Sequence, residues 1–337
     1  MNINFEHRSA AHCEAGVVSN LLNFYGYKLS EPMVFGVGAG LFFANMPFVP
    51  YKGNMMKFSF RSLPGAIFYH TMKNLQIKVK VKTRFVNKEK AMKEVDKLLA
   101  QGIPVGNVVG LYFLPYTPLR IHFNAHHLCV IGKEGDEYTV SDPTVAAIQK
   151  LSSNQLKKVR FSRGMFSPQG KMYWIKEKPV GLPDMRAAII KGIKTTCKNM
   201  IGIPLLPLGV RGIVLLSKQI RRIEAKYGEQ DALFFLATLL QSMEEFGTGG
   251  AGFRFLYSAF LYEAADVLDK PDMKNFATEM TKIGDLWRFF ALECGRKFKN
   301  RSNESCNELA DRVVEIAAKE QEFFLTLRKY IKTECRK

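Results

Sequence analysis

Two kinds of hydrophobic pattern follow each other along the chain. In the first part, residues 74–86 alternate between apolar and polar side chains as a half-buried strand does, whereas 87–102 repeat their apolar residues at helical spacing. Beyond the Pro- and Gly-bearing segment 176–186, almost every run has helical spacing. The pattern therefore predicts an α+β domain over residues 1–178 and an all-α helical domain over residues 179–337.

The first predicted helix begins at a cysteine. Cys13 directly precedes a run whose apolar residues recur at helical spacing, and Gly26 stands where that helix would stop. The thiolate is the reactive form of cysteine, and the N-terminus of a helix stabilises a negative charge. The position therefore favours a nucleophilic thiol, and the alternative is a small buried apolar side chain.

A nucleophilic cysteine needs a base and a group that orients the base. His126 and His127 open a predicted strand, and Asp142 ends the next strand of the same predicted hairpin. The two histidines point to opposite faces of the strand, so the register of the hairpin decides which one meets Asp142. We predict a catalytic set of Cys13, His126 and Asp142, with His127 as the alternative base.

A glycine-rich run offers a second candidate site. Gly249, Gly250 and Arg254 precede a predicted helix, where backbone N–H groups and a guanidinium can hold an anion of the substrate. The alternative is a bend between two packed helices. Zinc-ligand spacing and paired-carboxylate motifs are absent from the sequence, so no metal site is expected.

The charge is the strongest compositional feature. A formal net charge of +18 favours an anionic partner, and Lys157, Lys158 and Arg160 form one basic cluster. The sequence carries no zinc-finger, basic-zipper or RNA-binding signature, so nucleic acid is not the expected partner. We expect an acidic protein partner instead.

Other features bear on where the protein acts. The most apolar stretch, residues 200–210, is well short of the roughly 20 residues that cross a bilayer, so no membrane span is expected. The start of the chain has no secretory signal, and the six cysteines form no regular framework. These features predict reduced thiols and a cytoplasmic location.

Several motifs together resemble the butirosin-biosynthesis acyltransferase family. They are "FEHRSAAHCEAG" near the start, "LLNFYGYKLSEPMVFGVGAGLFF" after it, and "GTGGAGFRFLYSAFLYEAA" near residue 250. The resemblance implies a papain-like domain followed by a helical domain, which agrees with the order of Cys13, His126 and Asp142. It also places His7, six positions before the cysteine, in the oxyanion hole, where a glutamine is more usual. His12 and His127 are the remaining candidates for substrate binding.

The resemblance further implies a reaction. Members move an acyl group from a carrier-protein thioester to an amine, so we expect a cysteine-dependent acyltransferase that acts on an amine or hydroxyl of a small molecule. The enzyme would need no cofactor of its own, because an acidic acyl carrier protein would bring the acyl group as a phosphopantetheine thioester. Two alternatives remain: a papain-like cysteine peptidase or amidase, and a non-catalytic binding module on a degenerate protease fold.

Overall fold

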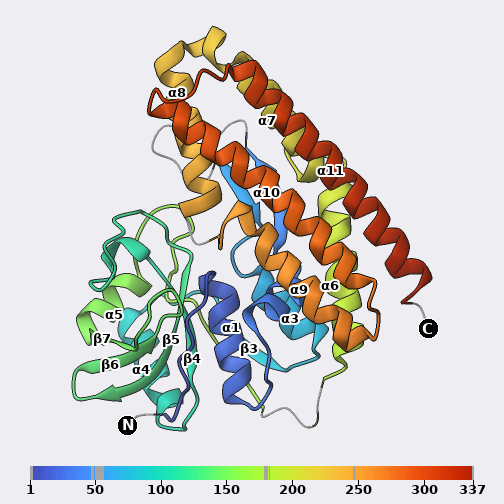
Figure 1. The fold of residues 1–337 in the computed structure, drawn as a ribbon. Coiled ribbons are helices and arrows are strands. Elements are labelled where there is room, and N and C mark those ends of the chain that lie inside the picture. Colours follow the sequence, from blue (N-terminus) through green and yellow to red (C-terminus); the bar gives the residue numbers. More distant parts are fainter. Residues whose placement is uncertain are drawn as a thin grey trace. The chain divides into compact units, whose positions relative to one another are not determined.

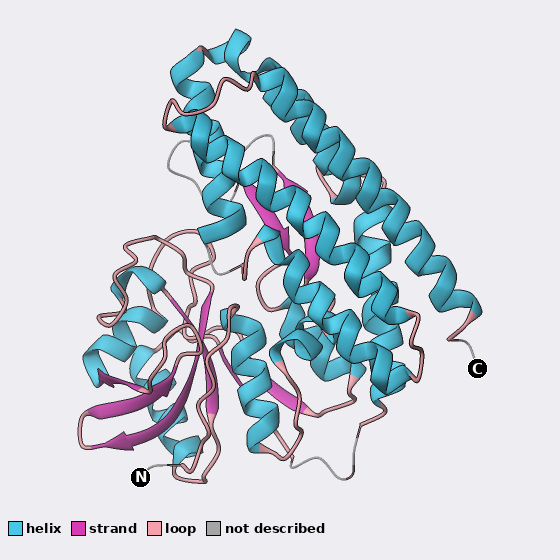
Figure 2. Cartoon of the chain, viewed as in Figure 1, coloured by secondary structure: helices cyan, strands magenta, loops and turns pink. Residues whose placement is uncertain are grey.

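The computed structural model describes residues 3–46, 49, 57–177, 181, 183–245 and 248–335. Contacts between residues divide the chain into two units. One contains Met1–Val34 and Leu75–Pro183, and the other contains Phe35–Asn74 and Asp184–Lys337. The structure is a mixture of helices and sheet with a helical C-terminal part, as the sequence predicts (Figures 1 and 2).

The first unit is built on an antiparallel sheet. Six strands of the described residues pair in the order β3-β8-β4-β5-β6-β7. Their bounds are Val79–Lys82 (β3), Val105–Val109 (β4), His126–Glu134 (β5), Glu137–Ser141 (β6), Gln149–Ser152 (β7) and Met172–Ile175 (β8). The helices of this unit are α1 (Cys13–Phe24), α4 (Lys88–Leu99) and α5 (Ser153–Arg160), and the short 3-10 helix η1 (Leu111–Phe113) follows β4.

Local signals place the helices of this unit. The Asn87 side chain accepts the Lys90 N–H at the start of α4, and Ser152 forms a capping box with Gln155 at the start of α5. The apolar faces of α4 and α5 pack on one face of the sheet, where Leu128 belongs to the buried core. Helix α1 contacts β4 and β5.

The second unit consists mainly of long helices. Their bounds are Met185–Ile201 (α6), Gly209–Tyr227 (α7), Glu229–Leu240 (α8), Arg254–Leu268 (α9), Met273–Phe298 (α10) and Cys306–Thr333 (α11). Figure 1 shows α7 running beside α11 and α9 beside α10. Two short helical segments, η2 (Gln241–Glu245) and η3 (Ala251–Phe253), connect α8 to α9.

Residues 35–74 pack with these helices, although the sequence analysis assigns them to the first domain. They form most of α2 (Glu31–Val37), the hairpin of β1 (Leu41–Asn45) and β2 (Phe58–Arg61), and α3 (Ala66–Asn74). The rings of Phe43 and Phe60 lie 6.1 and 5.6 Å from that of Trp287, so burial of aromatic side chains holds the hairpin in the helical unit. The predicted boundary between residues 178 and 179 lies outside the described residues.

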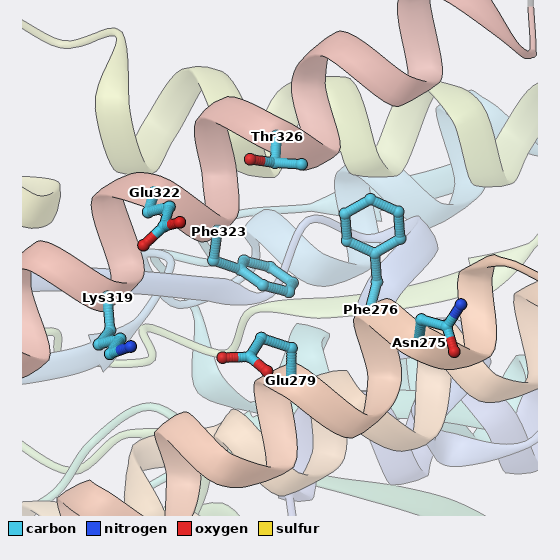
Figure 3. A pocket seen from close by; sticks show the side chains of 7 residues that line it. All are labelled: Asn275, Phe276, Glu279, Lys319, Glu322, Phe323 and Thr326. Carbon is cyan, nitrogen blue, oxygen red and sulfur yellow. The ribbon is translucent and has the colours of Figure 1, made fainter.

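A surface groove of about 330 Å³ lies between α10 and α11 of the second unit. Figure 3 shows its lining, in which the rings of Phe276 and Phe323 lie among polar side chains. None of the predicted site residues lines this groove. Among the helices of the described residues, none is long and apolar enough to span a membrane.

Candidate active site

Cys13 is the first residue of α1. His12 before it has an extended backbone, and its Nδ1 accepts the N–H of Ala15 at 3.2 Å, which makes His12 the N-cap of the helix. The side chain of Cys13 is buried, with 8% of its surface exposed. The thiol therefore lies at the positive end of the helix dipole, where the sequence pattern predicted it.

The register of the β5–β6 hairpin separates the two histidines. Val130 pairs with Val140, so the even-numbered residues of β5 up to Val130 face the same side of the sheet as Val140. That face carries His126, and Asp142 follows the end of β6 on the same side. The Nε2 atom of His126 lies 2.7 Å from Oδ2 of Asp142, and both side chains are buried.

His127 lies on the opposite face of the sheet. Its Nδ1 is 2.8 Å from the hydroxyl of Tyr173, and its Nε2 is 3.9 Å from a carboxylate oxygen of Glu14. All three side chains are buried, so His127 links β8 to α1 beneath the helix that carries Cys13. The structure thus pairs Asp142 with His126 and gives His127 other partners.

Asp142 accepts hydrogen bonds on both oxygens. Oδ1 accepts the N–H of Thr144 at 3.0 Å and its hydroxyl at 2.7 Å, while Oδ2 accepts the hydroxyl of Tyr116 at 2.9 Å in addition to the His126 contact. These bonds fix the carboxylate and, through it, the ring of His126. The sequence analysis missed both partners. A threonine two residues after an aspartate is a known turn signal, whereas Tyr116 lies in a loop with no such pattern.

The buried charges of the site stabilise one another. Burial alone would lower the pKa of His126, but the negative charges of Asp142 and Cys13 and hydrogen bonds to both outweigh it and raise that pKa to about 10. Burial alone would raise the pKa of Asp142, but the His126 charge and hydrogen bonds from His126 and Thr144 lower it to about 2. At neutral pH the site therefore holds an imidazolium next to a carboxylate.

The absence of a side chain at Gly16 lets α1 approach the turn that follows Asp142. Gly16 lies one turn after Cys13, and a Cβ at this position would lie 2.5 Å from Cβ of Ala10 and 2.7 Å from Cβ of Pro143. Real Cβ atoms do not come so close. The missing side chain at Gly16 is therefore what allows the helix with the thiol to lie against the turn with the carboxylate.

The predicted oxyanion role of His7 does not fit the structure. Its Nε2–H donates to the carbonyl of Val145 at 3.0 Å, and its Nδ1 accepts the hydroxyl of Ser141 at 2.8 Å. Both ring nitrogens are occupied by protein groups, so His7 has no N–H left for an oxyanion. It ties the N-terminal segment to the end of β6 instead.

The structure also does not support the predicted anion site at Gly249, Gly250 and Arg254. The guanidinium of Arg254 is completely buried, donates two hydrogen bonds to the carboxylate of Glu320 at 2.8 and 3.1 Å, and donates a third to the carbonyl of Gly252. Its charge is neutralised inside the helical unit, and a Cβ at Gly250 would meet Arg288. The run is a bend between packed helices, the alternative named above.

Metal ligands do not gather in the described part of the chain. Among those residues, no three or more His, Cys, Asp or Glu side chains form a group that could hold a metal ion. In the first unit, His126 contacts Asp142 and interacts electrostatically with Cys13.

Comparisons with known proteins add two family matches. Residues 154–327, just over half of the chain, match the family described as Domain of unknown function (DUF4872). Residues 12–143, which include Cys13, His126 and Asp142, match the family described as Butirosin biosynthesis protein H, N-terminal. The second match covers much of the first unit, including α1 and the β5–β6 hairpin.

The comparison with curated proteins found no match. Among solved structures, a C39-like peptidase from Bacillus anthracis matches at 16% identity over 52% of this chain and 98% of that chain, with a TM-score of 0.36.

We predict that the His126–Asp142 pair stabilises the fold in a limited pH window. The raised pKa of His126 contributes stability that is fully present below its unfolded value of 6.5 and is lost as pH rises through about 10. The lowered pKa of Asp142 contributes stability that is present above its unfolded value of 3.8 and is lost as pH falls through about 2. Urea unfolding should therefore show that His126→Gln costs roughly 2–4 kcal/mol more at pH 6 than at pH 10. A cost that does not change with pH would contradict the ion pair.

We also predict that Gly16→Ala lowers the reactivity of Cys13. The added methyl group must push α1 away from Pro143, and overpacking of this kind costs about 1–3 kcal/mol. The rate of Cys13 alkylation by iodoacetamide should fall roughly tenfold, because the thiol moves away from the His126 imidazolium. Gly295→Ala on α10 is the matched control, since its Cβ would meet only Leu240 at 3.4 Å, an ordinary contact. Equal rates in the two variants would show that the close approach is not needed.

Proposed function

The chain belongs to the family described as Domain of unknown function (DUF4872), and from this membership and the similarity to butirosin biosynthesis protein H we propose that it is a cysteine-dependent acyltransferase. One observation carries the proposal. A buried thiol at the start of a helix interacts electrostatically with a histidine, and a buried aspartate holds that histidine in place. This arrangement supplies a nucleophile and a group that both gives and takes a proton.

The first step forms an acyl-enzyme. The thiolate of Cys13 attacks the carbonyl carbon of a donor thioester, and a new C–S bond forms as the carbonyl oxygen takes up the negative charge. When the tetrahedral intermediate collapses, the C–S bond of the donor breaks, and the imidazolium of His126 gives its proton to the departing thiolate. One thioester replaces another, so this exchange needs little driving force.

The second step transfers the acyl group. The neutral imidazole of His126 now takes a proton from an amine or hydroxyl of the acceptor, whose nitrogen or oxygen attacks the acyl-enzyme. The bond between the acyl carbon and Sγ of Cys13 then breaks, and Cys13 returns to the thiolate form beside a protonated His126. Asp142 orients the ring in both steps and stabilises the imidazolium whenever His126 is protonated, and the backbone N–H of Cys13 is the candidate oxyanion donor at the helix start.

The donor that we propose is an acyl group on the phosphopantetheine arm of an acidic carrier protein. The basic cluster expected from the sequence changes in the structure, because Arg160 is completely buried and Lys157 forms an ion pair with Glu89. Lys158 and Arg163 remain exposed. The side-chain amide of Asn124, two residues before His126, donates to the carbonyls of Arg163 and Met165, so this basic segment is anchored next to the site.

We predict that Cys13→Ala abolishes acyl transfer and leaves the fold intact, because a single small side chain at a helix start adds little to the core. Acetyl and hexanoyl thioesters of N-acetylcysteamine serve as donors, and intact-protein mass spectrometry detects the acyl-enzyme. The mass increase should appear in the native protein and in the control Cys335→Ala, and turnover of Cys13→Ala should fall by at least roughly 10³-fold. Turnover that persists in Cys13→Ala would contradict the proposal. If the native protein hydrolyses a peptide library and transfers no acyl group, the result would favour a peptidase or amidase.

We predict that salt weakens the use of a carrier-bound donor. Raising the ionic strength from 0.1 to 1 M shortens the Debye length from about 10 to about 3 Å, which screens long-range attraction. KM for acetyl-phosphopantetheine on a small acidic carrier protein should rise with salt, whereas KM for the same acetyl group on N-acetylcysteamine should change little. The double charge reversal Lys158→Glu with Arg163→Glu should mimic high salt for the carrier-bound donor only.

The control for that variant is Lys299→Glu with Arg301→Glu, which reverses two exposed cations of the helical unit. Equal salt dependence for both donors would show that the basic charge does not recruit a carrier protein.

A further inference from the structure

The run from Tyr25 to Glu31 has no part in the catalytic set, although it is one of the motifs that carry the family resemblance. Its second residue is Gly26, whose φ of +93° turns the chain away from the end of α1. The chain then folds back along the helix, because the carbonyl of Leu29 accepts the hydroxyl of Ser19 at 2.6 Å and the side-chain amide of Asn23 at 2.9 Å. The end of the run is thereby returned toward the start of α1.

Glu31, the last residue of the run, contacts the segment that leads into Cys13. Its Oε2 accepts the backbone N–H of Ala11 at 3.0 Å, and its Oε1 accepts the backbone N–H of His12 at 2.6 Å. Both oxygens of one carboxylate are thus used on two consecutive amides directly before the nucleophile. Hydrogen bonds from N–H groups to a charged acceptor are about twice as strong as bonds between neutral groups.

The base of this side chain is itself held in place. The hydroxyl of Ser30 accepts the N–H of Met33, and the carbonyl of Ser30 accepts that of Val34 in the first turn of α2. Glu31 therefore approaches Ala11 and His12 from a short helix whose start is fixed. The carboxylate is a rigid acceptor rather than a mobile surface group.

The opposite end of the same segment is tied to the turn of the catalytic aspartate. The N–H of Ala10 donates to the carbonyl of Pro143 at 2.7 Å, and Pro143 directly follows Asp142. Residues 10–12 are consequently held between this turn and the Glu31 carboxylate. Because Cys13 comes next in the chain, these three backbone bonds set the direction of its backbone N–H and of its thiol.

We propose that Glu31 is a positioning residue that aligns Cys13 for attack on an acyl carbonyl. This inference rests on the proposed function, since it assumes that Cys13 is the nucleophile. Glu31 contacts neither the thiol nor His126 through any bond described above, and it acts through the backbone of Ala11 and His12. A misplacement of about 1 Å at a reacting group can cost roughly 10²-fold in rate, so loss of this clamp should slow acylation strongly.

The test compares two reactions of the same thiol. Acylation of Cys13 by acetyl N-acetylcysteamine requires an aligned attack on a carbonyl, whereas alkylation by iodoacetamide requires only an accessible thiolate. In Glu31→Ala we expect the acylation rate to fall roughly 10- to 100-fold while alkylation stays within about threefold of the native rate. Glu31→Gln should recover part of the acylation rate, because its amide oxygen still accepts one of the two N–H groups.

Glu6→Ala is the matched control. Glu6 lies on the same N-terminal segment, is exposed, and among the described residues forms its ion pair with Arg8 at the surface, so its removal should leave both rates unchanged. Native acylation in Glu31→Ala would overturn the proposal. A parallel loss of acylation and alkylation in both Glu31 variants would also overturn it, because it would show a general structural role.

The proposed function is tested separately by Cys13→Ala in the same acylation assay. An acyl mass increase that persists in Cys13→Ala would refute the nucleophile itself, whatever the Glu31 variants do.

Discussion

The contact between His126 and Asp142 is the constraint on which the first unit depends. A carboxylate buried without compensation is strongly destabilising, so every oxygen of Asp142 needs a partner. Those partners come from three places: β5 supplies His126, the following turn supplies Thr144, and the loop after β4 supplies Tyr116. The register of the hairpin and the path of that loop must therefore both be correct before the site can exist. A protonated imidazole at neutral pH is the chemical result.

Helix α1, which begins at Cys13, is held closely from several sides. Gly16 removes the atoms that would keep α1 away from Pro143, and His12 satisfies an N–H of the first turn. The carboxylate of Glu31 secures the two residues before the helix. These contacts fix the position of the Cys13 backbone, so that only the side-chain torsion angle of Cys13 decides whether the thiol faces His126. Alignment of this kind is prepared by folding rather than by the substrate.

The second unit also contains a buried ion pair, between Arg254 and Glu320. Arg254 and Glu320 are both completely buried, and their opposite charges neutralise each other across two hydrogen bonds. The indole N–H of Trp287 donates to the same carboxylate. The guanidinium also lies over the rings of Phe60 and Trp287, at 5.5 and 5.2 Å from their centres. A buried cation in this setting organises helices α9, α10 and α11 with the β1–β2 hairpin. It shows why a glycine-rich run followed by an arginine does not by itself indicate an anion site.

The sequence by itself determined what short-range forces control. Hydrophobic periodicity located the start of α1 at Cys13 and predicted the helix within residues 87–102 that the structure contains as α4, because such patterns act within one or two helical turns. They also predicted the hairpin that carries the histidines, although its second strand ends at Ser141, one residue before the predicted end at Asp142. Only the tertiary structure decided between His126 and His127, since a shift of one residue in pairing exchanges the two faces of a strand. It also decided the partners of His7, Arg254 and Glu31 and the assignment of residues 35–74 to the helical unit. Each of these depends on contacts between segments far apart in the chain, and no local pattern of residues records such contacts.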